Sequence, residues 1–502
     1  MFRLTDREIA VISAIIIGWF AYMARKKRSL LPHPPGPKGV PVLGNVFDLP
    51  DKGHWQTYKQ WAKELGSEII SLNMLGQRFV VLNDAKTADE VFGEKGAIYA
   101  GRKATSSSPT RNSLSHDTFL QTSFSDAQRS RWKYSRPELD VHYRRSVVPQ
   151  YRVPSIKVAH MLVRKLYAKP EDFMTHIRYI ANAAALHIAY GIEVEQDDDP
   201  RVDVSEIGSW GLEKSGDKNI VGIFPWLRHI PLKFALSLPG MQWRADAEKF
   251  KQWGFDLRDK PFDEIRPSLQ SGTAPPSIAA RMLDAERLKK NARWSDPRAR
   301  EAFVRGMAGA INIGGSDTSA NLNRFFVLAM VRFPQAQKRA HEELDRVIGS
   351  DRLPTFEDEP KLPYITAMVK ELIRWTAPLI PPHTNDVDDV YDGYFIPKGS
   401  IVLANNWAIL HDPETFPEPE DFVPERFLKD DGTLNPDAPD VMRGFGYGRR
   451  ICPGRYFALD FSWIVIASIT SIFRFKTAIA ADGSEIIPPI ELRHGLLKYV
   501  MS

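Results

Sequence analysis

The sequence predicts a mainly α-helical protein with small β-sheets, and three observations support this prediction. Long stretches of helical composition lack internal proline, the β-like runs are few and short, and no internal repeat or linker divides residues 51–502. The chain has 502 residues, of which 43% are hydrophobic, so it can bury a large core. Only 26% of residues are charged and no low-complexity tract is present, which excludes widespread disorder. We therefore expect residues 51–502 to form a single domain.

The N-terminus differs from the rest of the chain. An uncharged apolar segment, Ile9 to Ala24, is followed directly by four basic residues at 25–28. Its 16 residues are fewer than the roughly 20 that span a bilayer, although aromatic and basic side chains at its ends can reach the interface. Because basic residues collect on the cytoplasmic side, residues 1–28 are predicted to be a single-pass signal-anchor with the remaining chain in the cytoplasm. The alternative, a cleaved signal peptide, carries its basic residues before the apolar run.

Charge and cysteine content narrow the possible partners. A net charge of +5 and a pI near 9.0 are mildly basic, which favours an anionic membrane or an acidic protein partner. No basic stripe interleaved with aromatic residues is present, so we expect no nucleic-acid partner. Cys452 is the only cysteine, which excludes an intrachain disulfide and a multi-cysteine zinc site and agrees with a reducing compartment.

The predicted elements follow in order along the chain. Residues 29–50 contain the proline-rich run Leu31 to Pro41 and predict a stiff, extended segment, either a simple linker or a hinge between the anchor and the following domain. Proline positions and hydrophobic runs then predict strands, helices and a hairpin. The strands are Glu68–Leu72 and Gln77–Leu82; the helices are Pro297–Phe333, Gln335–Ile348, Tyr364–Thr376 and Pro453–Phe473; the hairpin joins Tyr394–Ile396 to Ile401–Leu403 through the turn 397–399.

The most informative segment surrounds Cys452. Arg449 and Arg450 precede the cysteine, and Pro453 follows at what the pattern predicts to be the first position of a helix. A helix N-terminus and nearby cations stabilise a thiolate. Glycines at 446, 448 and 454 allow tight turns and the close approach of a flat ligand. The pattern predicts a thiolate that is the axial ligand of a haem iron.

Two other roles for Cys452 stay open on this local pattern. A lone cysteine in a large intracellular chain is commonly a buried small hydrophobic residue. It can also be a catalytic nucleophile, which requires a histidine base nearby in space.

A second unusual segment lies in the middle of the longest predicted helix, where Gly314 and Gly315 precede Asp317 and Thr318. Each glycine inside a helix costs roughly 1 kcal/mol relative to alanine. The pair indicates either close helix packing or an opening in the helix. An acid and a hydroxyl beside a groove are suited to proton delivery.

The run around Cys452 resembles the haem-binding loop of the cytochrome P-450 family, which reads Phe-x-x-Gly-x-Arg-x-Cys-x-Gly. The fixed positions are occupied by Phe445, Gly448, Arg450, Cys452 and Gly454. Further segments match other motifs of the family in the same order along the chain, so the resemblance covers practically the whole sequence. It implies the family's triangular, mainly α fold with one N-terminal transmembrane helix, and haem b bound between the helix that carries Thr318 and this loop.

The resemblance also implies roles for two further groups. The segment 314–319 matches the family's oxygen-binding pattern, Ala/Gly-Gly-x-Asp/Glu-Thr-Thr/Ser, in which Thr318 orients water and donates a proton while Asp317 relays protons from solvent. Glu371 and Arg374 match the family's Glu-x-x-Arg motif, which with Arg426 implies a buried ion network that holds the loop of Cys452. Without the resemblance, an i, i+3 pair such as Glu371 and Arg374 is most simply an exposed surface pair.

The propionates of a haem require cationic or N–H partners. Trp132 and Arg136 resemble the family's Trp-x-x-x-Arg, Arg450 is the loop arginine with the same role, and His383 lies where relatives often carry a propionate-binding histidine. Alternatively, Trp132 and Arg136 are an ordinary surface pair, and His383 has a purely structural role.

The expected substrate contacts come from two segments. Residues one and two turns before the glycine pair would face the substrate, and the apolar, proline-broken segment 220–240 resembles the membrane-facing lid of the family or is a core loop. The residues concerned are Met307, Ala310, Ile311 and Phe224, with Trp226 and Leu227 beside the last.

The implied activity is the insertion of one atom of O₂ into a small apolar substrate, as in fungal secondary metabolism. Electrons would come from NADPH through a flavoprotein reductase, with cytochrome b5 as a further partner, at the endoplasmic reticulum membrane. Two alternatives remain: a haem-thiolate isomerase or dehydratase that needs no reductase, and a non-enzymatic membrane haem protein. The acid–alcohol pair Asp317-Thr318 argues against the first, since such relatives often lose it.

Overall fold

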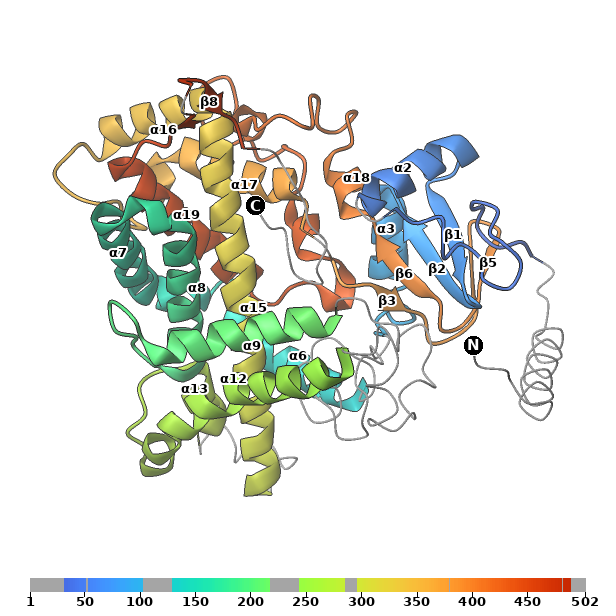
Figure 1. Ribbon diagram of the computed structural model, residues 1–502, viewed down its shortest axis with the longest axis horizontal. Helices are drawn as coiled ribbons and strands as arrows, with labels where there is room; N and C mark the ends of the chain where they lie inside the picture. Colours follow the sequence, from blue (N-terminus) through green and yellow to red (C-terminus); the bar gives the residue numbers. More distant parts are fainter. Residues whose placement is uncertain are drawn as a thin grey trace.

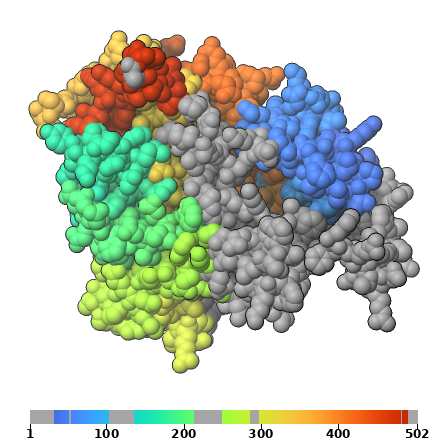
Figure 2. Space-filling view, viewed as in Figure 1, coloured from blue at the N-terminus to red at the C-terminus, as the bar shows by residue number. Residues whose placement is uncertain are grey.

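A computed structural model describes residues 31–50, 53–102, 129–216, 243–284, 296–378, 380–480 and 482–488. In this part of the chain a small β-rich lobe lies beside a larger helical lobe (Figure 1). The space-filling view shows the same division, with the blue N-terminal residues on the right and the teal and green residues of α7 to α13 on the left (Figure 2). The mainly helical architecture with small sheets is therefore confirmed.

A four-stranded sheet in the order β1-β2-β6-β3 forms the centre of the small lobe. β1 (Ile69–Met74) and β2 (Gln77–Leu82) are antiparallel and place Ile69 opposite Leu82. β2 runs parallel to β6 (Ile401–Ala404), and β6 is antiparallel to β3 (His383–Thr384). The sheet thus joins strands that lie more than three hundred residues apart in the sequence.

Alternate side chains of the sheet enter two different cores, because successive residues of a strand point to opposite faces. Val80 and Leu82 pack in a cluster with Phe92, whereas Val81 packs in a cluster with Ala62 of α2 (His54–Leu65). α3 (Ala85–Asp89) continues into a π-helical turn, η1 (Glu90–Glu94), which brings Phe92 beneath the sheet.

The helical lobe is built around α15 (Pro297–Arg332), a helix of 36 residues. It begins after Asp296, whose carboxylate accepts a hydrogen bond from the N–H of Arg298, and it ends before Pro334. The other helices of this lobe are α6 (Arg129–Tyr143), α7 (Arg152–Ala168), α8 (Phe173–Tyr190), α9 (Pro200–Gly216), α12 (Trp243–Ser271), α13 (Ile278–Leu283), α16 (Pro334–Val347), α17 (Pro363–Thr376) and α19 (Arg455–Ile472).

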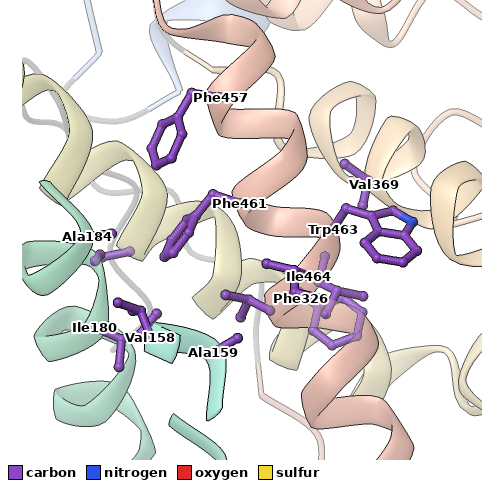
Figure 3. Packing of buried hydrophobic residues seen from close by; sticks show 14 of the residues in the cluster. Val158, Ala159, Ile180, Ala184, Phe326, Val369, Phe457, Phe461, Trp463 and Ile464 are labelled. Carbon is purple, nitrogen blue, oxygen red and sulfur yellow. The ribbon is translucent and has the colours of Figure 1, made fainter. Parts of the chain in front are cut away.

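The core of the helical lobe surrounds α19. Its side chains lie among residues from α7, α8, α15 and α17 (Figure 3). Phe461 and Ile464 are fully buried there, as is Phe326 of α15. Within the described ranges α19 is the one helix long and apolar enough to cross a membrane, and 61% of its most apolar stretch is buried. Its apolar composition is thus used in packing against other helices.

The predicted helices agree with the structure to within one or two residues at each end. The predicted hairpin is wrong. β5 (Tyr394–Ile396) pairs with β4 (Asp389–Tyr391), and β6 pairs with β2 and β3 of the larger sheet. Asp392 and Gly393, with φ of 49° and 76°, form the tight turn between β4 and β5. The turn 397–399 instead carries the chain from one sheet to the other. The residues of a turn do not specify which strand the following segment pairs with, because that partner lies far away in the sequence.

The proline-rich segment lies against the β-rich lobe. The carbonyl of Pro35 accepts a hydrogen bond from the N–H of Ser71 at 2.7 Å, and the carbonyl of Pro32 accepts one from Phe395 at 2.7 Å. Residues 31–50 are therefore fastened to the domain that follows them. The predicted anchor, residues 1–28, lies outside the described residues.

Candidate functional site

Cys452 lies in a loop between two short 3₁₀ helices, η8 (Met442–Phe445) and η9 (Gly448–Arg450), and the start of α19. Its backbone N–H donates to the carbonyl of Phe445 at 2.8 Å, which closes the loop on itself. The predicted helix start at Pro453 is wrong by two residues, because the first helical residue is Arg455. Cys452 therefore precedes the helix rather than capping it.

The charges around the thiol differ from the prediction. Burial raises the pKa of Cys452, while the N–H of Gly454 and the cations Arg136 and Arg455 oppose that rise. The expected neighbours, Arg449 and Arg450, are not among these causes. The protein alone therefore favours the thiol, and a bound metal ion would supply the charge that stabilises a thiolate.

The β-rich lobe positions this loop through a close backbone contact. Gly448 has φ of 48°, and a Cβ atom there would lie 2.0 Å from the carbonyl oxygen of Phe92 in η1. Only glycine permits this approach. On the outer side Arg443 pairs with Asp89 at 2.7 Å.

Asn406 is a site residue that sequence reasoning missed. From α18 (Asn406–Leu410) its Nδ2 donates to the carbonyl of Arg443 at 2.9 Å, and its Oδ1 accepts from the hydroxyl of Tyr447 at 2.8 Å. Asn406 is only 4% exposed. Nothing in the local sequence marks it, because its partners come from a loop almost forty residues further along.

A second group of predicted residues shares one face of α15. Ala310, Gly314 and Thr318 recur every four residues and are all accessible, whereas the helix around them is largely buried. A Cβ atom at Gly314 would meet nothing within 4 Å, while one at Gly315 would lie 3.5 Å from Cβ of Ala185 on α8. Helix packing accounts for Gly315, and Gly314 faces open space.

The acid–alcohol pair lies next to this open face. The Thr318 hydroxyl donates to the carbonyl of Gly314 at 2.7 Å, so its lone pairs stay available. Asp317, the preceding residue on α15, is partly buried. Of the expected substrate contacts, Met307 is 0% exposed and Ile311 is 7% exposed, and both belong to the main core cluster. Met307 lies seven residues before Gly314 and Ile311 lies seven residues before Thr318, so both are on the same side of α15 as the open face and stay predicted substrate contacts.

Glu371 and Arg374 form a fully buried ion pair. Arg374 donates to both carboxylate oxygens of Glu371, at 2.7 and 2.8 Å, and both side chains are 0% exposed. Arg426 approaches the same carboxylate at 3.4 Å, and the N–H of Val423 donates to it at 2.8 Å. Arg374 also donates to three backbone carbonyls, those of Leu410, Pro419 and Asp421. The network therefore clamps the segment 410–426, which precedes the Cys452 loop.

His383 lies at the centre of a buried cationic cradle. The ring is 3% exposed and its Nδ1 donates to the carbonyl of Tyr99 at 2.7 Å. Burial lowers the pKa of His383 well below its usual value, and the charges of Arg102 and Arg450 lower it further. Its Nε2 is buried and has no hydrogen-bond partner among the described residues.

The two arginines of this cradle reach it from distant segments. Arg450 donates to the carbonyl of Ala100 at 2.7 Å, and Arg102 donates to the carbonyls of Pro381 and Pro382. Arg102 is only 5% exposed and was missed by the sequence analysis. Arg102 and His383 are buried and Arg450 is partly buried, and a cluster of two cations with an unsatisfied imidazole nitrogen is suited to an anionic group, so the residues present fit a haem propionate.

Trp132 and Arg136 both lie on α6, one turn apart. Arg136 pairs with Asp140 at 3.1 Å and also donates to the carbonyl of Ile451, beside Cys452. Phe224, Trp226 and Leu227 lie outside the described residues. In the described ranges no group of three His, Cys, Asp or Glu side chains could hold a metal ion.

Comparisons with known proteins agree with this arrangement. The family model described as cytochrome P450 matches residues 34–491. The chain is 33% identical to tryptamine 4-monooxygenase of Psilocybe cyanescens, over 98% of this chain and 96% of that protein. It is 34% identical to cytochrome P450 monooxygenase ple1 of Rhodocybe pseudopiperita, over 98% and 92%, and 32% identical to cytochrome P450 monooxygenase COX2 of Coprinopsis cinerea, over 98% and 91%.

Proposed function

The chain belongs to the cytochrome P450 family of haem-thiolate monooxygenases, and we propose that Cys452 would ligate the iron of its haem and that Thr318 and Asp317 would deliver protons from α15. When bound, a thiolate-ligated haem activates O₂ with electrons from NADPH, supplied through a reductase, and inserts one oxygen atom into the substrate.

The protein's residues then have separable tasks. Cys452 holds the cofactor on one side, and Arg102, His383 and Arg450 hold its propionates. A bound propionate would accept a hydrogen bond from His383 and offset the two arginines, which favours the protonated ring. Thr318 presents a hydroxyl at the open face of α15 and Asp317 exchanges protons with solvent behind it. The ion network of Glu371 keeps the cysteine loop in place.

The observation that carries this proposal is the combination of a lone thiol in a closed loop with a buried cationic cradle nearby. The test is the reduced, carbon-monoxide-bound spectrum of the purified protein. Cys452→Ala should abolish the Soret band that a thiolate ligand produces. Ser468→Ala, a change of similar size in the buried part of α19, should preserve it. An unchanged band in Cys452→Ala would exclude the assignment.

The substrate is proposed to be a small, largely apolar molecule of fungal secondary metabolism. Support comes from the open space beside Gly314 on α15 and from fungal relatives, one of which is named as a tryptamine monooxygenase. Reconstitution with a fungal NADPH-dependent flavoprotein reductase, with and without cytochrome b5, should be followed by mass spectrometry of products from tryptamine and from a host extract. A gain of one oxygen atom that requires NADPH is expected; oxidation without reductase would favour a different haem-thiolate reaction.

We also propose a single-pass location in the endoplasmic reticulum membrane with the catalytic domain in the cytoplasm. The support is the apolar segment 9–24 followed by basic residues. The full chain should sediment with microsomes after carbonate washing, and protease added outside sealed microsomes should digest the catalytic domain. Protection of that domain would reverse the proposed orientation.

A further inference from the structure

A cavity of about 440 Å³ opens between α7, α8 and α13, on the side of the helical lobe away from the β-rich lobe (Figure 1). Pro154 of α7, Ile188 of α8 and Arg281 of α13 lie in its wall. Ligand pockets in proteins typically measure about 300–1,000 Å³, so the cavity has room for a small organic molecule. None of the residues that line it belongs to the proposed haem site. We call it the Arg281 cavity.

Two local features of the sequence shape the Arg281 cavity. Gly191 ends α8 with φ of 77°, a conformation that favours glycine, and a Cβ atom there would lie only 3.0 Å from Cβ of Pro275. The loop that contains Pro275 can therefore approach the end of α8 closely. Ser277 then caps α13 with its hydroxyl, and Ile278 fastens this short helix to the core with 0% exposure. Arg281, one turn later, is left at the cavity.

The guanidinium of Arg281 is only partly satisfied by the protein. Its Nη1 donates to Oε1 of Gln150 at 2.8 Å, and its Nη2 donates to the hydroxyl of Tyr151 at 2.7 Å. Both partners are neutral, because burial raises the pKa of Tyr151 to about 12 although Arg281 opposes the rise. Among the described residues no carboxylate forms an ion pair with Arg281, and its Nε has no hydrogen-bond partner. A guanidinium has five N–H donors, so Arg281 keeps donors and charge for a further group.

The other ionisable groups of the lining leave this charge uncompensated. Glu193 pairs with Lys157 at 3.2 Å, and their side chains are 68% and 66% exposed, so the two charges offset each other in solvent. Burial lowers the pKa of His187, Glu193 opposes this shift and Lys157 adds to it, so the ring is neutral at about pH 7. The Arg281 cavity therefore carries a net positive charge that is centred on Arg281.

Apolar side chains form the rest of the wall, namely Pro154, Ile188, Pro275 and Pro276. A guanidinium recognises a planar carboxylate through two parallel hydrogen bonds, and apolar walls favour a hydrocarbon body. We propose that the Arg281 cavity is a second binding site, separate from the haem site, for a small carboxylic acid in its ionised form. The carboxylate binds to Arg281, and the apolar body packs against the prolines.

The first test compares an acid with its amide on the unaltered holoenzyme. The probe is 4-phenylbutyrate, and 4-phenylbutyramide is a neutral analogue of nearly the same shape. Clotrimazole, an imidazole that ligates haem iron, is present throughout to keep both compounds out of the haem pocket. Calorimetry at about pH 7 should show the acid binding at least about tenfold more tightly than the amide, because only the acid carries a charge for Arg281. Equal affinities would overturn the proposal.

The second test locates the bound acid. Arg281→Met should weaken its binding about tenfold or more, whereas Arg164→Met, at an exposed arginine of α7, should change it by less than about twofold. Arg281→Lys keeps the charge and should lose less affinity than Arg281→Met. The thiolate Soret band should persist in all three variants. If Arg281→Met binds the acid as tightly as Arg164→Met does, the proposal is wrong.

The apolar wall is tested by competition with an inorganic anion. Phosphate in tenfold excess over 4-phenylbutyrate should not displace it, because phosphate has no hydrocarbon body to pack against the prolines. Displacement would show that the cavity accepts any small anion and would overturn its assignment to a carboxylic acid.

Discussion

The loop of Cys452 and the open face of α15 differ in how closely other parts of the protein pack against them. The loop is held by three kinds of contact. Gly448 packs against the backbone of Phe92, Asn406 makes hydrogen bonds with two residues of the loop, and Arg443 forms an ion pair with Asp89. The α15 face has a glycine, Gly314, with nothing within 4 Å of where its side chain would lie. The proposed iron ligand thus lies on the crowded side and the proposed oxygen and substrate side is left open. A metal ligand benefits from fixed geometry, whereas small molecules that bind and leave require space.

The largest expected effect is at the crowded side. Gly448→Ala would place a methyl group 2.0 Å from a backbone oxygen that cannot move without η1. We expect a loss of more than ~4 kcal/mol in the free energy of unfolding, with loss of haem retention. Urea unfolding and the haem-to-protein absorbance ratio measure both.

Gly432→Ala separates the clash from backbone strain. Gly432 also has positive φ, 79°, but its added Cβ would meet nothing within 4 Å. Its cost should be limited to the left-handed conformation, roughly 1–2 kcal/mol. Equal losses in the two variants would show that the contact with Phe92 is unimportant.

The next effect concerns the clamp behind the loop. Glu371→Gln removes the carboxylate that Arg374 and Arg426 share and leaves buried cations uncompensated, at a cost of about 3–5 kcal/mol. Glu342→Gln, in an exposed pair with Lys338, should cost less than about 0.5 kcal/mol. Denaturant melts of both variants test this, and similar midpoints would contradict a structural role for the network.

A smaller, pH-dependent effect is expected from His411, which adjoins the same clamp. Burial, and then the charge of Arg374, lower its pKa to about 3. Below pH 6.5 the unfolded chain binds a proton at this residue that the folded chain does not. The contribution of His411 to the free energy of unfolding is therefore fully present above pH 6.5, and it falls by about 1.4 kcal/mol per pH unit as the pH drops towards 3. His411→Gln should flatten this slope in melts between pH 6.5 and 4.5, whereas His176→Gln, at an exposed histidine, should not.

The smallest effect is at the open face. Gly314→Ala should raise the free energy of unfolding by about 0.5–1 kcal/mol, because alanine is the better helix former and no atom is in its way. It should also slow carbon-monoxide binding to the reduced enzyme, measured by flash photolysis. The methyl group added by Gly315→Ala would face Ala185 instead, so this variant should also raise the free energy of unfolding but should bind carbon monoxide at the unaltered rate. If both variants bind carbon monoxide equally fast, Gly314 does not line the ligand path.

The elements that could be predicted were those with strong local signals. Pro297 and Pro334 bound the longest helix to within a residue, and the spacing of Glu371 and Arg374 predicts that both lie on one face of α17, whereas their burial was implied only by the family resemblance. The hairpin failed because the pairing of β6 with β2 is decided by a partner more than three hundred residues away. The cations that act on Cys452 differ from those expected for a related reason, since they include Arg136, which comes from α6.

By itself the sequence determined the helical class, the single thiol, the acid–alcohol pair and the family, because each depends on residue types at fixed local spacing. Tertiary structure alone decided that Gly314 is open while Gly315 is packed, that Asn406 and Arg102 belong to the site, and that Met307 belongs to the core. Those distinctions depend on which distant backbone fills the space beside a residue. Distances of that kind arise only once elements that are far apart in the sequence have packed together.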